Sequence, residues 1–207
     1  MMIRTYLIAG VLASSASLVA GAGQRAPAKG RGAARTSTAL TCAAELGQGI
    51  GTKIRFCDVI VGAKPAESVA ITIPARRGPA RLQFDLHNRI AVPPAGAAPA
   101  QVFSKNTAMV AVMGPKGEIG RAVADVEFRK PGDLFDRIGG GVGGGAKTVA
   151  PGPATPIDMT VPPGMNAIGI VGVRLKVVTR LGEQTYDTPG RPIAIVSNVR
   201  VEYTPAR

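Results

Sequence analysis

Residues 107–129 read TAMVAVMGPKGEIGRAVADVEFR, two strand-like arms around the turn sequence GPKG at positions 114–117. A turn is expected there because proline fixes its own φ and glycine accepts backbone angles that other residues avoid. In the second arm, Val126 and Phe128 share a face opposite Asp125, which is the period-two pattern of a half-buried strand. The stretch therefore predicts a β-hairpin, and with it an antiparallel sheet.

Five further segments have strand length and β-branched or alternating apolar residues: 53–61, 68–73, 81–87, 166–179 and 193–203. The fourth changes phase near its glycines, as a β-bulge does. The 27 Gly and 17 Pro residues disfavour an all-helical protein, since both residue types break helix interiors. We therefore predict an all-β fold, namely an antiparallel β-sandwich that is either jelly-roll-like or immunoglobulin-like.

Three segments depart from this strand pattern. Residues 41–46 and 133–138 each predict a short helical turn, too short for the crossover helix of a parallel sheet. Residues 139–156 (GGGVGGGAKTVAPGPATP) hold little that can build a core. We predict that they form one long, flexible Gly/Pro-rich loop.

The N-terminus has the pattern of an export signal. An uncharged apolar run at 6–20 ends at the small-x-small sequence AGA, which predicts a secretory signal peptide, residues 1–22, that is cleaved. The run is shorter than the roughly 20 apolar residues of a membrane-spanning helix. Residues 23–40 then read as a flexible basic leader, and 41–207 as a single folded domain without a transmembrane segment.

The two cysteines agree with export. Cys42 and Cys57 are the only pair in the chain, and an oxidising compartment would allow them to form a disulfide bond. Two cysteines and one distant histidine supply too few ligands for a zinc site. The sequence therefore predicts a structural disulfide in a protein of the periplasm, the cell surface or the extracellular medium.

The formal net charge of +12 favours anionic partners, such as a cell-envelope surface or an acidic glycan. Outward positions of the predicted strands supply a basic face, which we assign to Arg81, Arg89, Arg174, Lys176, Arg180 and Arg200. The chain has no Trp and few Tyr, which disfavours an aromatic platform for sugars or for single-stranded nucleic acid. No specific nucleic-acid partner is predicted.

The densest group of reactive side chains is Asp85-Leu86-His87-Asn88-Arg89. Asp85 precedes the only histidine by two positions, so both side chains would share one face of a strand, where the acid would orient the imidazole. The sequence identifies no nucleophile to act with this pair. The same Asp-x-His pattern also occurs at the solvated end of a strand, where polar side chains pair with neighbours across the sheet. Both interpretations stay open on the sequence.

Two further motifs do not indicate a functional site. Residues 141–148 (GVGGGAKT) resemble a phosphate-binding loop, but proline follows where a helix would have to begin. Asp125 and Glu127 have a spacing found in glycosidases, yet Arg129 continues the row as a charge-balanced face would. No metal site or cofactor is predicted.

We conclude that the sequence predicts an exported, non-catalytic β-sandwich protein of the bacterial type. It would bind an anionic surface polymer, a glycan or a partner protein. The candidate binding residues are Arg81, Asp85, His87, Asn88, Arg89, Arg174, Lys176, Arg180 and Arg200. One alternative is a structural subunit that assembles through its strand edges into a surface or extracellular polymer. A second is a hydrolase centred on Asp85 and His87.

Overall fold

The fold was analysed in a computed structural model, in which the structure is described for residues 34–36, 39–94, 96–98 and 102–206. The strands are β1 (Ala34–Thr36), β2 (Ala39–Cys42), β3 (Glu45–Gln48), β4 (Arg55–Ile60), β5 (Val69–Thr72), β6 (Arg76–Ala91), β7 (Ser104–Gly114), β8 (Gly117–Phe128), β9 (Val149–Pro151), β10 (Thr155–Val161), β11 (Ala167–Thr179), β12 (Gly182–Tyr186) and β13 (Pro192–Pro205). Three short 3-10 turns complete the elements: η1 (Pro65–Glu67), η2 (Pro131–Asp133) and η3 (Val142–Gly144). The prediction of an all-β fold is confirmed.

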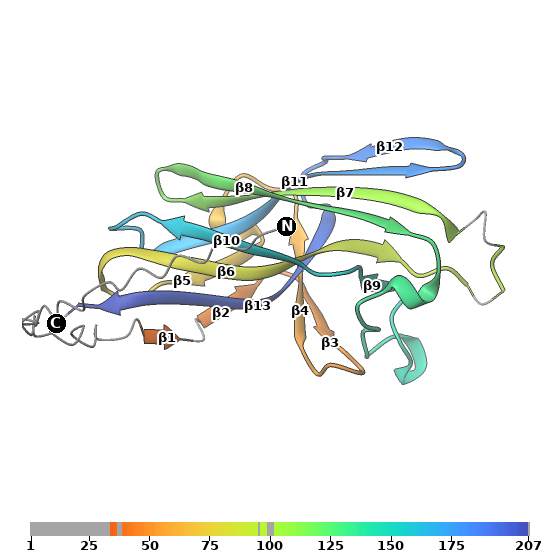
Figure 1. The fold of residues 1–207 in the computed structure, drawn as a ribbon, viewed down its shortest axis with the longest axis horizontal. Coiled ribbons are helices and arrows are strands. Elements are labelled where there is room, and N and C mark those ends of the chain that lie inside the picture. Colours follow the sequence, from red (N-terminus) through yellow and green to blue (C-terminus); the bar gives the residue numbers. More distant parts are fainter. Residues whose placement is uncertain (1–33, 37–38, 95, 99–101, 207) are drawn as a thin grey trace, which may run out of the picture. The chain divides into compact units, whose positions relative to one another are not determined.

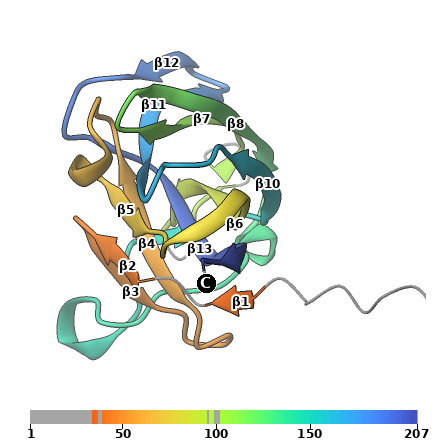
Figure 2. The same cartoon turned by 90° about the vertical axis from the view of Figure 1, so that its left-hand side faces the viewer.

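The strands form two sheets, in which every pairing between strands is antiparallel (Figures 1 and 2). Sheet A has the order β10-β6-β13-β4-β3, and β1 and β9 pair with β13 and β6 respectively. Sheet B has the order β2-β5-β11-β7-β8, and β12 pairs with β11. The chain repeatedly passes from one sheet to the other, so neighbours within a sheet are mostly distant in sequence.

The inner faces of the two sheets share one hydrophobic core. Leu82, Phe84 and Leu86 of β6 are buried in it, as their alternation predicts, and Ile168 and Ile170 of β11 meet them from sheet B. A second, smaller cluster lies on the outer face of sheet A and consists of Leu46, Phe56, Ile138 and Ile195, with Ile54 and Phe135 packed against it. The residues after β8 thus cover part of sheet A.

A disulfide joins Cys42 to Cys57, as predicted, with 5.7 Å between the two Cα atoms. Cys42 ends β2 in sheet B and Cys57 lies in β4 in sheet A. The bond therefore ties the two sheets together across one side of the core.

Both predicted helical turns are wrong. Residues 41–42 end β2 and residues 45–46 begin β3, with a bend between them, because ladder hydrogen bonds to β5 and β4 outweigh a weak local preference. In 133–138 only Asp133 lies in a 3-10 turn, where its carboxylate accepts the backbone N–H groups of Arg129 and Lys130. The rest of that segment is not helical, and its Phe135 and Ile138 pack in the second cluster.

The loop predicted at 139–156 is interrupted by secondary structure. Val149–Pro151 forms β9 on the edge of β6, and β10 already begins at Thr155. The sequence understates this part because Ala150, which is fully buried, is too small to produce an apolar pattern. Similarly, β1 lies within the predicted leader at 23–40 and β2 begins at its end, while the predicted signal peptide is outside the described residues.

Candidate functional site

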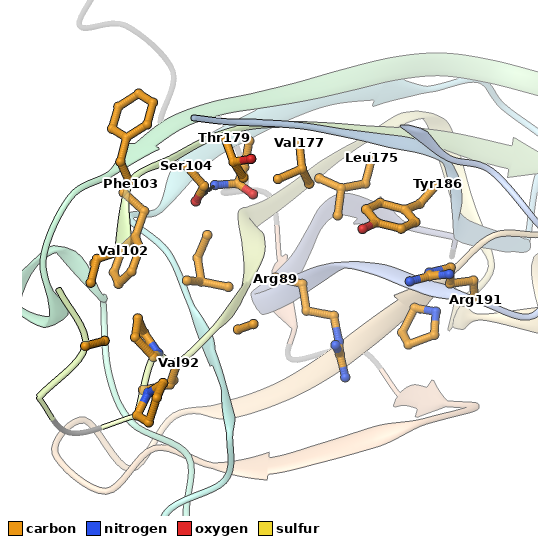
Figure 3. Close-up of a pocket in the computed structure, with 18 residues that line it drawn as sticks. Arg89, Val92, Val102, Phe103, Ser104, Leu175, Val177, Thr179, Tyr186 and Arg191 are labelled. Atoms are coloured by element: carbon orange, nitrogen blue, oxygen red, sulfur yellow. Dashed lines mark hydrogen bonds between the residues drawn. The ribbon is translucent and has the colours of Figure 1, made fainter. Parts of the chain in front are cut away.

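A cavity of about 900 Å³ opens between the two sheets, at the end where β6 stops and β7 begins (Figure 3). Its apolar lining is Ile90, Ala91, Val92, Pro93, Pro94, Ala97, Val102, Phe103, Phe128, Leu175, Val177 and Pro192. Its polar lining is Arg89, Ser104, Asn106, Thr179, Tyr186 and Arg191. None of these described lining residues is acidic. The volume and the mostly apolar wall are those of a small-molecule site.

The cavity exists because sheet B extends further than sheet A at this end. The β11–β12 hairpin projects at this end, at the upper right of Figure 1, whereas β13 begins only at Pro192. The inward side chain of Val177 therefore lacks the cover that a longer β13 would give it, while Leu175 lies deeper in the wall. Leu175 is 7% exposed and Val177 is half-buried. An apolar surface is thus left facing an open space.

Arg191 and Tyr186 form the polar end of the cavity. The guanidinium carbon of Arg191 lies 4.0 Å from the ring centroid of Tyr186, and the two side chains lie side by side in Figure 3. Val92, Val102 and Phe103 are on the opposite side of the same view. Such stacking orients an arginine while leaving its N–H groups free to donate. Arg191 forms no ion pair with any of the described residues.

Asn106 supplies a second polar group in the lining. Its side chain belongs to an inward position of β7 and the residue is only 4% exposed. Its Nδ2 donates a hydrogen bond to Ser104 Oγ at 2.8 Å. A buried amide at the wall of a cavity can orient a polar part of a ligand.

The second arginine of the lining, Arg89, already has a partner. Its Nε donates to Asp58 Oδ1 at 2.9 Å, and Asp58 is 7% exposed. Burial raises the pKa of the Asp58 carboxyl, and the charge of Arg89 opposes that shift. Because Arg89 is held by this pair, Arg191 is the lining cation that remains available to an anionic ligand.

His87 does not lie at a solvated strand end. Its ring is fully buried, with Nδ1 2.8 Å from the carbonyl oxygen of Gly152 and Nε2 2.9 Å from Ser197 Oγ. The rings of Phe56 and Phe135 pack against it. Burial lowers the pKa of His87, so the neutral imidazole is favoured. The segment after β8 covers a face that the sequence pattern alone leaves open.

Asp85 and Asn88 are also committed to structure. Asp85 accepts a hydrogen bond of 2.7 Å from Asn198 Nδ2, within sheet A. Asn88 is fully buried on the opposite face of β6, where its Nδ2 donates to the carbonyl oxygen of Ala124. The strand therefore separates Asn88 from the side chains of Asp85 and His87.

The predicted basic face is divided between opposite sides of the protein. Arg81 and Arg200 lie on the outer face of sheet A, and Arg174 and Lys176 on the outer face of sheet B. Arg180 stands at the tip of the β11–β12 hairpin. These side chains do not form one continuous surface, because β6 and β13 belong to sheet A and β11 belongs to sheet B.

Several of these cations are already paired. Arg81 binds Asp158 through a charge-assisted contact and lies 3.8 Å from Glu202. Lys176 lies 2.8 Å from Glu183 across the hairpin. Exposed pairs of this kind contribute little to stability, but they reduce the charge offered to a polymer.

The outer face of sheet A has a smaller hollow of about 240 Å³. Asp158, Gln83 and Arg200 form one row across β10, β6 and β13, and Asp85 and Asn198 lie in the next row. The structure thus brings together two of the predicted binding residues, Asp85 and Arg200, on a surface rich in hydrogen-bonding groups.

The residues that the sequence did not reveal are Tyr186, Arg191 and Asn106. The residues between Tyr186 and Arg191 read DTPG, a sequence typical of a turn. Such a sequence predicts that the chain reverses direction, but it does not predict that the two flanking side chains stack on each other. Asn106 precedes an apolar run and resembles an ordinary polar strand residue. No signal in the sequence identifies these three as one site.

Three absences apply to the part of the chain that the structure describes. It holds no cluster of three or more His, Cys, Asp or Glu side chains suited to a metal ion. Among the same residues, no helix has the length and apolar character needed to cross a membrane. All cysteines there belong to the disulfide.

Comparison of the chain with protein-family models, with curated proteins and with solved structures finds no match. The geometry described above is therefore the basis for a functional conclusion.

Proposed function

We propose that the protein is an exported, non-catalytic binding protein whose cavity takes an amphipathic acid, an elongated apolar molecule with a carboxylate or phosphate at one end. The observation that carries the proposal is the composition of the lining: apolar walls, a stacked arginine without an ion pair, and no carboxylate among the described lining residues. A neutral sugar or a cation would leave Arg191 without a complement.

The two halves of such a ligand would match the two sides of the cavity. The apolar part would lie between Val102 and Val177, where removing apolar surface from water stabilises a complex by about 25 cal/mol per Å². The acidic group would accept hydrogen bonds from Arg191. A charge-assisted hydrogen bond of this kind contributes about 1.5–3 kcal/mol, which is enough to select an acid over a neutral analogue.

The fold and the export signal support the same type of protein. Eight strands, taken from β4 to β13 without β9 and β12, are divided between the two sheets in the orders β4-β13-β6-β10 and β5-β11-β7-β8. These are the strand orders of the two sheets of an eight-stranded jelly roll, and we assign that type of sandwich. Jelly rolls hold unrelated activities, so the fold alone assigns no ligand. The disulfide and the signal-like residues 1–22 support export.

The proposal is tested by titrating the protein with cis-parinaric acid, a fatty acid that fluoresces in apolar surroundings. We expect saturable binding by the natural protein. Val177→Trp, which fills the cavity, should weaken binding at least tenfold. Val178→Trp is the matched control, because Val178 is the neighbouring residue on the outer face of β11. No saturable binding, or equal binding by both variants, would refute the proposal.

A second candidate function is glycan binding on the outer face of sheet A. The polar rows around Asp85, Gln83 and Arg200 offer both donors and acceptors to hydroxyl groups. Affinity electrophoresis in gels containing neutral or acidic polysaccharides tests it. If a polysaccharide gel retards the natural protein, Arg200→Ala should be retarded less in that gel. Arg174→Ala should be retarded as much as the natural protein.

The remaining functions stay predictions. Assembly through strand edges is not tested by one chain. A hydrolase centred on Asp85 and His87 would require a movement that uncovers the ring of His87 from Phe56 and Phe135.

A further inference from the structure

The β11–β12 hairpin presents an aliphatic side chain to solvent at its tip. Leu181 is fully exposed, and the exposed residue Arg180 stands next to it. Arg180 forms no ion pair with any residue that the structure describes. Single apolar side chains are common on protein surfaces. What distinguishes Leu181 is its place at the tip of a hairpin, directly beside an exposed arginine.

The tip has a defined conformation. The hydroxyl of Thr179 accepts the backbone N–H of Leu181 at 3.2 Å and donates to the carbonyl oxygen of Gly182 at 3.3 Å. Gly182 has a φ of +135°, which glycine adopts far more readily than other residues. The Lys176–Glu183 ion pair links the two arms. Leu181 is therefore held outward by the turn.

The same hairpin lines the cavity. Val177 and Thr179 on one arm and Tyr186 on the other are lining residues, and Thr179 directly precedes the Arg180-Leu181 tip. The tip and part of the cavity wall thus belong to the same hairpin. A surface contacted by Leu181 would lie beside the part of the cavity that Thr179 lines.

We propose that this tip docks on an anionic lipid surface, with Leu181 inserted among the acyl chains and Arg180 at the headgroups. This inference rests on the proposed function, since a lipid layer is where single-chain amphipathic acids collect. Charge supports a lipid partner, because the chain carries a net charge of +12 and a basic residue beside an anionic surface adds to binding. Leu181 and Arg180 would supply only part of a weak, reversible attachment, and the remaining net positive charge of the chain would supply the rest.

A matched control is available in the same molecule. Val142 in η3 is, like Leu181, an aliphatic residue that is fully exposed. It belongs to the segment after β8 and is not among the lining residues of the cavity. A general effect of adding charge to an exposed aliphatic position would appear at Val142 and Leu181 alike, whereas docking by the hairpin would appear at Leu181 alone.

The experiment is co-sedimentation with vesicles of phosphatidylcholine, alone or with a quarter of phosphatidylglycerol. The protein is expressed with its complete N-terminal sequence and purified in the form that the cell exports. We expect the natural protein to bind the anionic vesicles, Leu181→Asp to bind at least fivefold more weakly, and Val142→Asp to match the natural protein. All three should bind cis-parinaric acid in solution with equal affinity.

Each other outcome contradicts the inference. It is wrong if the natural protein ignores anionic vesicles, if Leu181→Asp binds them normally, or if Val142→Asp loses as much. Failure of the proposed function looks different, because the natural protein would then lack saturable binding of cis-parinaric acid whatever its behaviour with vesicles.

Discussion

Arg191 lies over the aromatic ring of Tyr186, with its guanidinium carbon 4.0 Å from the ring centroid. Tyr186 ends β12 and Arg191 directly precedes β13, so a four-residue connection brings them together at the wall of the cavity. The contact converts a long, flexible side chain into a fixed donor. The proposed selectivity for acids depends on that arrangement.

Removing the ring should therefore weaken acid binding without filling the cavity. A cation–π contact contributes about 0.5–2 kcal/mol, so Tyr186→Leu should lower the affinity for an acidic ligand about 2- to 30-fold. Tyr186→Phe keeps the ring and should stay within twofold of the natural protein. Competition against cis-parinaric acid measures both. Equal losses in the two variants would show that the hydroxyl, rather than the ring, is what matters.

His87 should make stability depend on pH below neutrality. Burial lowers its pKa from the ordinary value of 6.5, although the Gly152 carbonyl and Asp85 oppose the shift. As pH falls below about 6.5, the unfolded chain takes up a proton that the folded chain resists, and the free energy of unfolding decreases by up to about 1.4 kcal/mol per pH unit. Above that pH this residue contributes no dependence.

Urea unfolding at pH 7.5 and pH 5.5 tests this contribution in the natural protein and in His87→Gln. The variant should be less stable at both values, because it loses the packing against Phe56 and Phe135. Its difference in stability between the two pH values should nevertheless be smaller. Carboxyl groups such as Asp58, whose pKa is raised by burial, titrate in both proteins and cancel in the comparison. An unchanged difference would argue against a buried neutral histidine.

The Cys42–Cys57 bond should contribute substantially to stability. It closes a segment with a sequence separation of 15, for which the chain-entropy model gives about 3 kcal/mol. Replacing both cysteines with alanine should lower the melting temperature by about 6–12 °C for a domain of this size. Dithiothreitol should lower the melting temperature of the natural protein and leave that of the double variant unchanged. A natural protein insensitive to the reductant would contradict the assignment.

Gly169 should be the least replaceable glycine of β11. A Cβ atom there would lie 2.4 Å from the Cα and carbonyl oxygen of Pro65, which are backbone atoms that cannot turn aside. Gly169→Ala should therefore lower the free energy of unfolding by about 1–3 kcal/mol. Gly120→Ala is the control, because a Cβ there meets only Met159, at an ordinary 3.6 Å. Thermal unfolding of the two variants should differ clearly; equal melting temperatures would show that η1 can move away from β11.

The sequence predicts those strands whose side chains alternate between the core and the solvent. Leu82, Phe84 and Leu86 are buried as their period of two requires, and the turn at 114–117 joins β7 to β8. The sequence does not predict six of the strands, namely β1, β2, β3, β9, β10 and β12. β12 is exposed along most of its length and β9 is only three residues long, so neither produces an apolar pattern.

The candidate site could not be predicted from the sequence for a different reason. The cavity is lined by segments far apart in the chain, from the end of β6 to the start of β13, and only the arrangement of the two sheets brings them together. His87 shows the same limit, since a strand pattern cannot reveal that Phe135, far along the chain, covers the outer face. Local periodicity predicts which face of a strand a residue is on, but not what lies opposite.

The most direct test of the cavity as an acid site compares decanoate with decanol as competitors of cis-parinaric acid. The two have equal chain lengths and differ mainly in the charge presented to Arg191. We predict that the natural protein and the surface control Arg174→Gln prefer decanoate at least tenfold, and that Arg191→Gln loses this preference while still binding decanol. Equal binding of the acid and the alcohol by the natural protein, or a preference that survives Arg191→Gln, would contradict the account.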